Sequence, residues 1–488
     1  MQNLETLILA VTSRLYQLRH NPDFPSFDAP ERHALNCVRV LTRLLPYIYE
    51  ADHLEDWEES FFWSTRRRKI KIGTTNHGDV VAEPEDVNAN GAETTQEPKD
   101  EDFEHVKPLA EELIDTLVDL LFFSDFTLIK TEAEKAKVNY SIWQSGVGCN
   151  TAVGSNQDVE LRRMEILRLL LTLSSKSMYT SANVLPVQGI KAITYLTTLE
   201  EKQIVLTLLC SLLNTALKYN PATWRVPYDH MVFKDTKQVF VTYCLQLLLV
   251  LVLYPVPDSP TGAPQKNSFR HFLGKLHRPQ DFQFLVDGMT RILNQPLQAT
   301  TSILPGSQKS LTWAPEMIML FWEVLQCNKR FRSFIVDTDR AHDFVVLILF
   351  HAVSNRTDPS KQGIVRMCVF VLQTLSVEDT FGSRLNKTFH GQETLPPIIR
   401  LPNFHGTYAD FLIIVGSLSC ADANYLLTIT VHPHVDHVRQ RQAGRYLPSI
   451  AGYNQQCRTA CAGAVGRCFF KTVAAVCSDV LSCVYPCE

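Results

Sequence analysis

The chain has 488 residues, of which 45% are hydrophobic, 20% charged and 10% aromatic. This apolar share is typical of a folded globular chain and excludes global disorder, while the length predicts about three domains or one long repeat structure. The 47 basic and 51 acidic side chains leave a net charge of −4, which is too balanced for a dedicated nucleic-acid-binding protein.

The first 65 residues are predicted to form the N-terminal helices. Apolar residues at three- and four-residue spacing between Leu4 and Leu18 predict an amphipathic helix rather than a signal peptide, because no basic segment precedes them and no small-residue cleavage site follows. A second helix is expected to begin near Pro30, and Pro46 is expected to end or kink it.

Residues 66–107 are strongly polar and are predicted to form a disordered loop between helices. Between Asp79 and Glu104 there are ten acidic residues against the single base Lys99, which leaves too little apolar area to offset the entropy of ordering. The segment opens with the basic residues Arg66, Arg67, Arg68, Lys69 and Lys71. These residues are membrane-contact candidates, at about 1 kcal/mol each on an anionic surface, or a solvated stretch balanced by the acidic run.

Residues 108–420 show helical periodicity almost throughout. Helices are expected at 108–123, 158–179, 199–219, 236–254, 281–294, 315–336, 341–353 and 363–376. Many apolar helices in series, without β-type alternation, predict an all-α helical-repeat solenoid of the armadillo or HEAT kind. No clean sequence repeat is visible, so the repeat is expected to be degenerate.

Two helical segments allow a second interpretation. The segment 236–254 is apolar almost all round, but it is short for a membrane span and polar residues interrupt it, which favours a central helix of the stack. Phe321, Phe331 and Phe334 alternate with basic residues, as in a nucleic-acid-binding patch. Their helical spacing favours packing in the core instead.

Residues 421–488 differ in character from the rest and are predicted to be an atypical His- and Cys-rich tail. Six of the 13 cysteines lie in the last 58 residues, while others such as Cys37, Cys210, Cys244 and Cys368 lie in apolar helical stretches. An odd total without a signal peptide predicts a reducing compartment.

The tail contains the sharpest chemical motif in the chain. His432, His434, Asp436 and His437 match H-x-H-x-D-H, a metal-binding signature of metallo-β-lactamase-like hydrolases. Only 51 residues follow, none of them His, so the further ligands of that fold are missing and a coincidental cluster is favoured. A zinc site formed with Cys457 and Cys461 is a weaker alternative.

Other catalytic motifs are absent from the sequence. It contains no GxxxxGK[ST], no GxGxxG after a strand, no GxSxG and no HExxH. We therefore expect no enzymatic activity, no cofactor, no small-molecule substrate and no nucleic-acid partner.

A series of segments in fixed order carries a family resemblance: LTRLLPYIYE (41–50), SIWQSGVGCN (141–150), RRMEILRLLLT (162–172), SLLNTALKYNP (211–221), HRPQDFQFLVDGMTRILNQPL (277–297), MLFWEVLQCNKRFRSFIV (319–336), FGSRLNK (381–387) and PNFHGTYADFLIIV (402–415). Together they resemble the high-temperature-induced dauer formation family, relatives of dymeclin, over roughly residues 1–415. The resemblance implies a non-enzymatic, cytoplasmic helical-repeat protein that attaches peripherally to Golgi and trans-Golgi membranes. It implies partners in the secretory pathway and a role in vesicle trafficking, including dense-core vesicle and neuropeptide sorting.

The chain departs from this family pattern at both ends. Family members typically begin with Met-Gly for myristoylation, whereas this chain begins Met1-Gln2 and could not be acylated in that way as written. The family's long C-terminal half is replaced by the Cys-rich tail. The alternatives to a membrane scaffold are therefore a soluble helical adaptor or, through the tail motif, a metal-dependent hydrolase.

Overall fold

The computed structural model describes residues 2–69, 103–129, 136–181, 184–220, 236–258, 262–301 and 311–422. In this part of the chain the helices begin at the N-terminus with α1 (Gln2–His20), α2 (Glu31–Glu50), α3 (Glu55–Trp63) and α4 (Leu109–Leu120). The middle of the chain forms α5 (Gln157–Ser174), α6 (Leu185–Gln188), α7 (Lys191–Thr197), α8 (Lys202–Lys218), α10 (Thr236–Leu253) and α11 (Ser268–Gly274). The remainder forms α12 (Pro279–Thr301), α13 (Ala314–Cys327), α14 (Lys329–Asp337), α15 (Ala341–Asn355), α16 (Gln362–Ser376), α17 (Phe381–Arg384) and α18 (Tyr408–Asp422).

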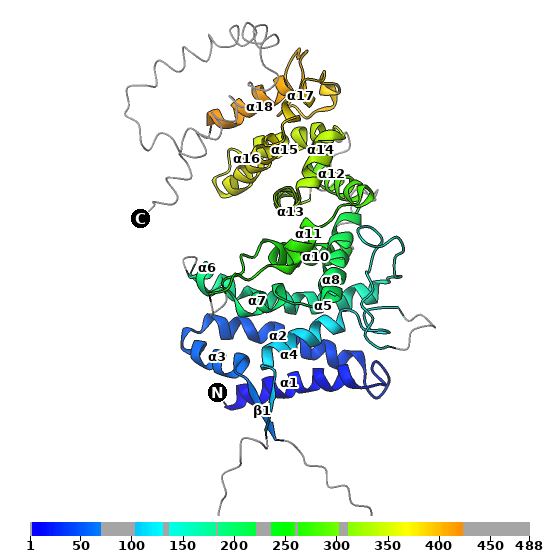
Figure 1. The fold of residues 1–488 in the computed structure, drawn as a ribbon, viewed down its shortest axis with the longest axis vertical. Coiled ribbons are helices and arrows are strands. Elements are labelled where there is room, and N and C mark those ends of the chain that lie inside the picture. The colour runs from blue at the N-terminus through cyan, green and yellow to red at the C-terminus, as the bar shows by residue number, and fades with distance from the viewer. Residues whose placement is uncertain are drawn as a thin grey trace, which may run out of the picture.

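The long helices stack in two rows that run along the molecule (Figure 1). In one row α2, α5, α10, α13 and α16 each pack against the next, and in the other α8, α12, α15 and α18 follow one another. The rows are joined by pairs such as α8 with α10 and α12 with α13. Each helix therefore buries its apolar side against neighbours close in the chain, as in a helical solenoid. The predicted all-α fold is confirmed, while the repeat type stays a prediction.

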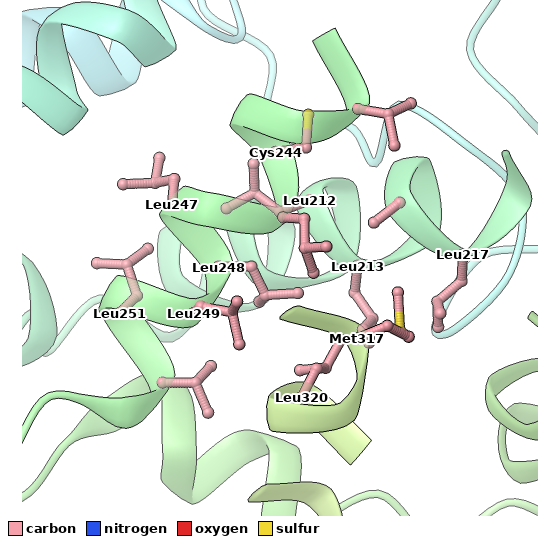
Figure 2. Packing of buried hydrophobic residues seen from close by; sticks show 14 of the residues in the cluster. Leu212, Leu213, Leu217, Cys244, Leu247, Leu248, Leu249, Leu251, Met317 and Leu320 are labelled. Atoms are coloured by element: carbon pink, nitrogen blue, oxygen red, sulfur yellow. The ribbon is translucent and has the colours of Figure 1, made fainter. Parts of the chain in front are cut away.

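Among the described residues, the main hydrophobic core runs through the stack from Ile8 in α1 to Val415 in α18, and Ile190, Ile193 and Tyr254 form a second, small cluster. In the middle part of the main core, α10 packs against both α8 and α13. Figure 2 shows Leu213 of α8, Leu248 of α10 and Leu320 of α13 gathered in this region. Helix α10 alone is long and apolar enough to cross a membrane among the described helices, but half of that window is buried inside the protein. Its contacts with α5, α8 and α13 agree with the interpretation as a central helix of the stack.

The short strands β1 (Arg66–Lys69) and β2 (Phe103–Val106) correct the predicted disordered loop at both of its ends. They pair antiparallel, with Arg66 opposite Val106. Arg66 is also anchored, because it forms an ion pair with Glu112 and donates from Nε to the Lys107 carbonyl at 3.0 Å. The strand pairing and the contacts of Arg66 satisfy backbone and side-chain hydrogen-bonding groups that the sequence predicted to be exposed to solvent. Residues 70–102 between the strands, which include most of the acidic run, lie outside the described residues.

Other predicted boundaries also need correction. Pro46 does not end α2, which continues to Glu50, because a proline near the end of a helix removes only one backbone hydrogen bond; the predicted kink stays a prediction. The segment predicted as one helix at 315–336 is two helices, α13 and α14, divided at Asn328, whose side chain caps α14. Short helices such as α3, α7 and α11 were not predicted, because fewer than ten residues give little periodicity.

Candidate interaction site beside the 141–150 loop

The site residues proposed from sequence are only partly within the described structure. His432, His434, Asp436 and His437, with Cys457 and Cys461, lie outside it, as does Lys71. Across the described ranges, no group of three or more His, Cys, Asp or Glu side chains could hold a metal ion. Of the basic run, Arg66 is engaged with Glu112, while Arg67, Arg68 and Lys69 belong to β1.

The predicted aromatic and basic patch is part of the core. Phe321 and Phe331 are fully buried, and their rings contact each other edge to face with centroids 6.4 Å apart. Phe334 is partly buried against the same cluster. These rings cannot stack on nucleic-acid bases without unfolding the helices, so the core interpretation is confirmed.

The loop 141–150, which carries one of the family-like segments, is held on α8 by side-chain hydrogen bonds. Asn214 of α8 is fully buried beneath it and holds it by three hydrogen bonds. Its Nδ2 donates to the Gln144 and Val147 carbonyls at 2.9 and 3.0 Å, and its Oδ1 accepts from the Val147 N–H at 2.9 Å. One amide side chain thus satisfies three backbone groups and fixes the loop on α8.

Two glycines let this loop lie close to its neighbours. Gly146 has φ +151° and Gly148 has φ +72°, conformations that residues with a side chain rarely adopt. A Cβ on Gly146 would lie 2.6 Å from the Phe284 ring and 2.7 Å from Asn214 Oδ1. The G-x-G spacing in the sequence is therefore explained by close packing on α8 and α12.

Trp143 anchors the start of the loop in the core. Its ring is fully buried, and the guanidinium of Arg163 in α5 lies 4.5 Å from the ring centroid. Burial lowers the pKa of Arg163 to about 9, because the charged form is poorly solvated there. The cation–π contact with Trp143 compensates part of that loss.

A polar pocket of about 320 Å³ opens between this loop and the start of α12. It is lined by Ser145, Gly146, Gly148, Cys149, Asn150, Arg278, Gln280 and Asp281. Asp281, in the first turn of α12, is 9% exposed and accepts from the Gly148 N–H at 3.5 Å. The pocket thus combines a buried carboxylate, a free thiol and backbone from a rigid loop.

The two thiols at the loop differ in chemistry. Cys149 lines the pocket, is partly exposed and donates from Sγ to the Thr151 carbonyl at 2.8 Å. Cys210 lies buried beneath Gly148, and burial raises its pKa to about 12. Cys149 is therefore the thiol that reagents in the pocket can reach, whereas Cys210 behaves as a small hydrophobe.

This pocket was not predicted from the sequence. Its loop was noticed only as part of the family resemblance, and no motif identified Asp281 or Arg278. The pocket joins loop residues to α12 residues more than 130 positions away, as in the Gly148–Asp281 contact. The Gly146 and Gly148 pair was the one local signal that could have marked a tightly packed loop.

Comparisons with known proteins agree in a single family. The family model described as Hid1, high-temperature-induced dauer-formation protein, matches residues 1–428. The Ubp5-interacting protein ftp105 of Schizosaccharomyces pombe is 31% identical over 475 residues, which cover 84% of this chain and 50% of the relative. Protein HID1 of Homo sapiens is 33% identical over 406 residues, covering 78% of this chain and 47% of the relative. This chain therefore spans about half the length of these curated relatives, and no solved structure matches it.

Proposed function

The chain belongs to the Hid1 family, and from this we propose that it is a non-catalytic helical scaffold that acts peripherally on Golgi and trans-Golgi membranes. Its task is vesicle trafficking in the secretory pathway, including dense-core vesicle and neuropeptide sorting, through protein partners on the cytoplasmic side. The observation that carries the proposal is the match of the family model to residues 1–428.

The architecture supports a scaffold that works by its surface. Two rows of helices share the main hydrophobic core, so the described part of the molecule presents a long outer face built from packed helices. The relatives reported above do not carry the names of enzymes, and one of them is named for its interaction with a protein called Ubp5. These points support protein binding as the activity.

Localisation and secretion test the proposal directly. A tagged full chain is expressed in neuroendocrine cells that lack their own family member, and membranes are separated by density. We expect the chain to fractionate with Golgi membranes, to be released by carbonate washing and to restore storage of a dense-core cargo. A chain that stays in the cytosolic fraction while restoring storage would favour the soluble adaptor, and loss of both would reject the scaffold.

The basic run can be tested separately on vesicles. The variant Arg67→Glu, Arg68→Glu, Lys69→Glu reverses three charges and leaves Arg66 in its pair with Glu112. We expect it to bind phosphatidylserine vesicles less than the wild type, because each basic residue contributes about 1 kcal/mol at an anionic surface. A matched reversal of three charges, at the exposed Lys202, Lys237 and Lys266, should have little effect. Unchanged vesicle binding by the triple variant would dismiss the basic run.

A further inference from the structure

The pocket beside the 141–150 loop contains a buried carboxylate, that of Asp281, which receives few hydrogen bonds. Asp281 is nine-tenths buried, and its one hydrogen bond, from the Gly148 N–H, is long at 3.5 Å. Among the described residues, none forms a salt bridge with it. A buried carboxylate without a partner cation is unfavourable, and its place near the start of α12 offsets only part of that cost. Asp281 is therefore ready to accept a cation from outside.

The loop does not offer the donors that an anion would need. The N–H groups of Gly146 and Cys149 bond each other's carbonyls, and that of Val147 is taken by Asn214. The Gly148 N–H faces Asp281 itself. Glycine loops that hold phosphate present free N–H groups, and here four consecutive N–H groups are occupied. The loop therefore contributes shape rather than positive charge.

Two cations lie close to the pocket: Arg278 is one of its lining residues, and Lys218 contacts the lining residue Ser145. Arg278 and Lys218 are both exposed, and Lys218 donates to Ser145 Oγ. Solvent and salt screen charges at such exposed positions, whereas the charge of the buried Asp281 is screened much less. An incoming group therefore meets a dominant negative charge once it is inside the pocket.

We propose that this pocket binds a basic side chain, a lysine or an arginine, of a partner protein, with Asp281 as the residue that recognises it. The proposal rests on the proposed function as a protein-binding scaffold and names the chemistry of one contact. The volume of about 320 Å³ compares with ~30 Å³ for one water molecule in the liquid, so the pocket has room for one long side chain. A charged donor would give Asp281 the short, charge-assisted hydrogen bond that the folded chain does not provide.

The thiol of Cys149 allows a direct test on the purified full chain. The chain is equilibrated under mildly reducing conditions with symmetrical disulfides that carry amine, hydroxyl or carboxylate ends, each in two- and four-carbon lengths. Peptide mass mapping then measures which cap Cys149 retains. We expect an amine cap to be retained about tenfold more than its hydroxyl analogue, and the carboxylate cap least, because only the amine can form a charge-assisted hydrogen bond with Asp281.

Two variants on the same helix separate the pocket from general charge effects. Asp281→Asn should abolish the amine preference, while its Tm stays unchanged or rises because an uncompensated buried charge is removed. Asp287→Asn, which alters an exposed carboxylate paired with Arg340, should keep the preference. An equal yield of all caps on the wild type, a carboxylate preference, or an amine preference that survives in Asp281→Asn would each overturn the proposal.

This result is independent of the cellular experiment. The cap competition uses no membrane and no partner, so failure of Golgi localisation with an intact amine preference would reject the scaffold role and retain the pocket. Golgi localisation without any amine preference would reject the pocket and retain the scaffold role.

Discussion

Asn328 joins three helices through one side chain, and its removal should weaken the stack measurably. Its Oδ1 caps α14 by accepting from the Phe331 N–H at 3.0 Å. Its Nδ2 donates to the Leu273 and Leu276 carbonyls, at the end of α11, at 3.1 and 2.9 Å. Asn267 repeats this arrangement between α10 and α11. Both asparagines place the end of one helix against the start of another.

The expected cost follows from these contacts. Asn328→Ala removes a helix cap, worth about 1 kcal/mol, and leaves the Leu276 carbonyl without its donor, at roughly 1–3 kcal/mol. The Leu273 carbonyl still accepts a hydrogen bond from the Leu276 N–H, so its loss of Asn328 costs little free energy. The sum is about 2–4 kcal/mol. Asn156, an exposed cap of α5, contributes only its bond to the Val159 N–H, so Asn156→Ala should cost about 1 kcal/mol.

Aspartate variants separate the contribution of the helix cap from that of the Nδ2 hydrogen bonds. Aspartate caps a helix as well as asparagine, so Asn156→Asp should be nearly neutral. Asn328→Asp keeps the cap but loses both donors and turns a carboxylate toward two carbonyls, so it should destabilise the protein by at least about 2 kcal/mol. Opening of one region need not unfold a long stack, so hydrogen exchange is the assay.

Mass spectrometry should show faster exchange in segments 268–276 and 329–337 of Asn328→Asp and not in α5. The global Tm is recorded beside it for all four variants. Equal behaviour of the Asn328→Asp and Asn156→Asp proteins would refute the reasoning, because it would mean that the two Nδ2 contacts contribute nothing beyond the cap.

Three further predictions concern single residues. Gly146→Ala should lower the unfolding free energy by about 2–4 kcal/mol, since it adds backbone strain and a 2.6 Å contact with the Phe284 ring. Gly363→Ala, which has open space around it, should be neutral or stabilising, and chemical denaturation measures both variants. Burial lowers the pKa of His351 below its usual 6.5, so the unfolded chain binds more protons. Stability should then fall as pH drops below about 6.5, and His351→Gln should flatten the slope in pH-dependent melting; an unchanged slope would contradict this. Iodoacetamide at pH 8 should alkylate Cys149 at least about tenfold faster than Cys244, whose pKa burial raises; equal rates by peptide mapping would disprove the burial argument.

Long periodic segments were predictable because their apolar spacing is a local property. The segments 108–123, 236–254 and 341–353 were placed close to α4, α10 and α15. The central position of the fourth predicted helix, at 236–254, also followed from its composition, since a helix that is apolar all round has no side suited to solvent. These features need no knowledge of what lies beside the segment.

The division at Asn328 and the strands at the ends of the polar loop could not be found in this way. A cap between two helices depends on where the end of α11 lies, and Asn328 is 52 and 55 residues away from the carbonyls that it binds. Likewise, Arg66 appears free in the sequence and is held by Glu112 in the fold. Local pattern carries no information about such distant partners.

The sequence by itself determined the helical class, the apolar rows that stack and the family resemblance, because all three depend on residue types and their spacing. The tertiary structure alone decided the pocket. Asp281 is an ordinary polar residue at the start of a helix until the Gly146 and Gly148 loop, fixed by Asn214, covers it. Its burial without a cation arises from three segments far apart in the chain, and only the packed fold brings them together.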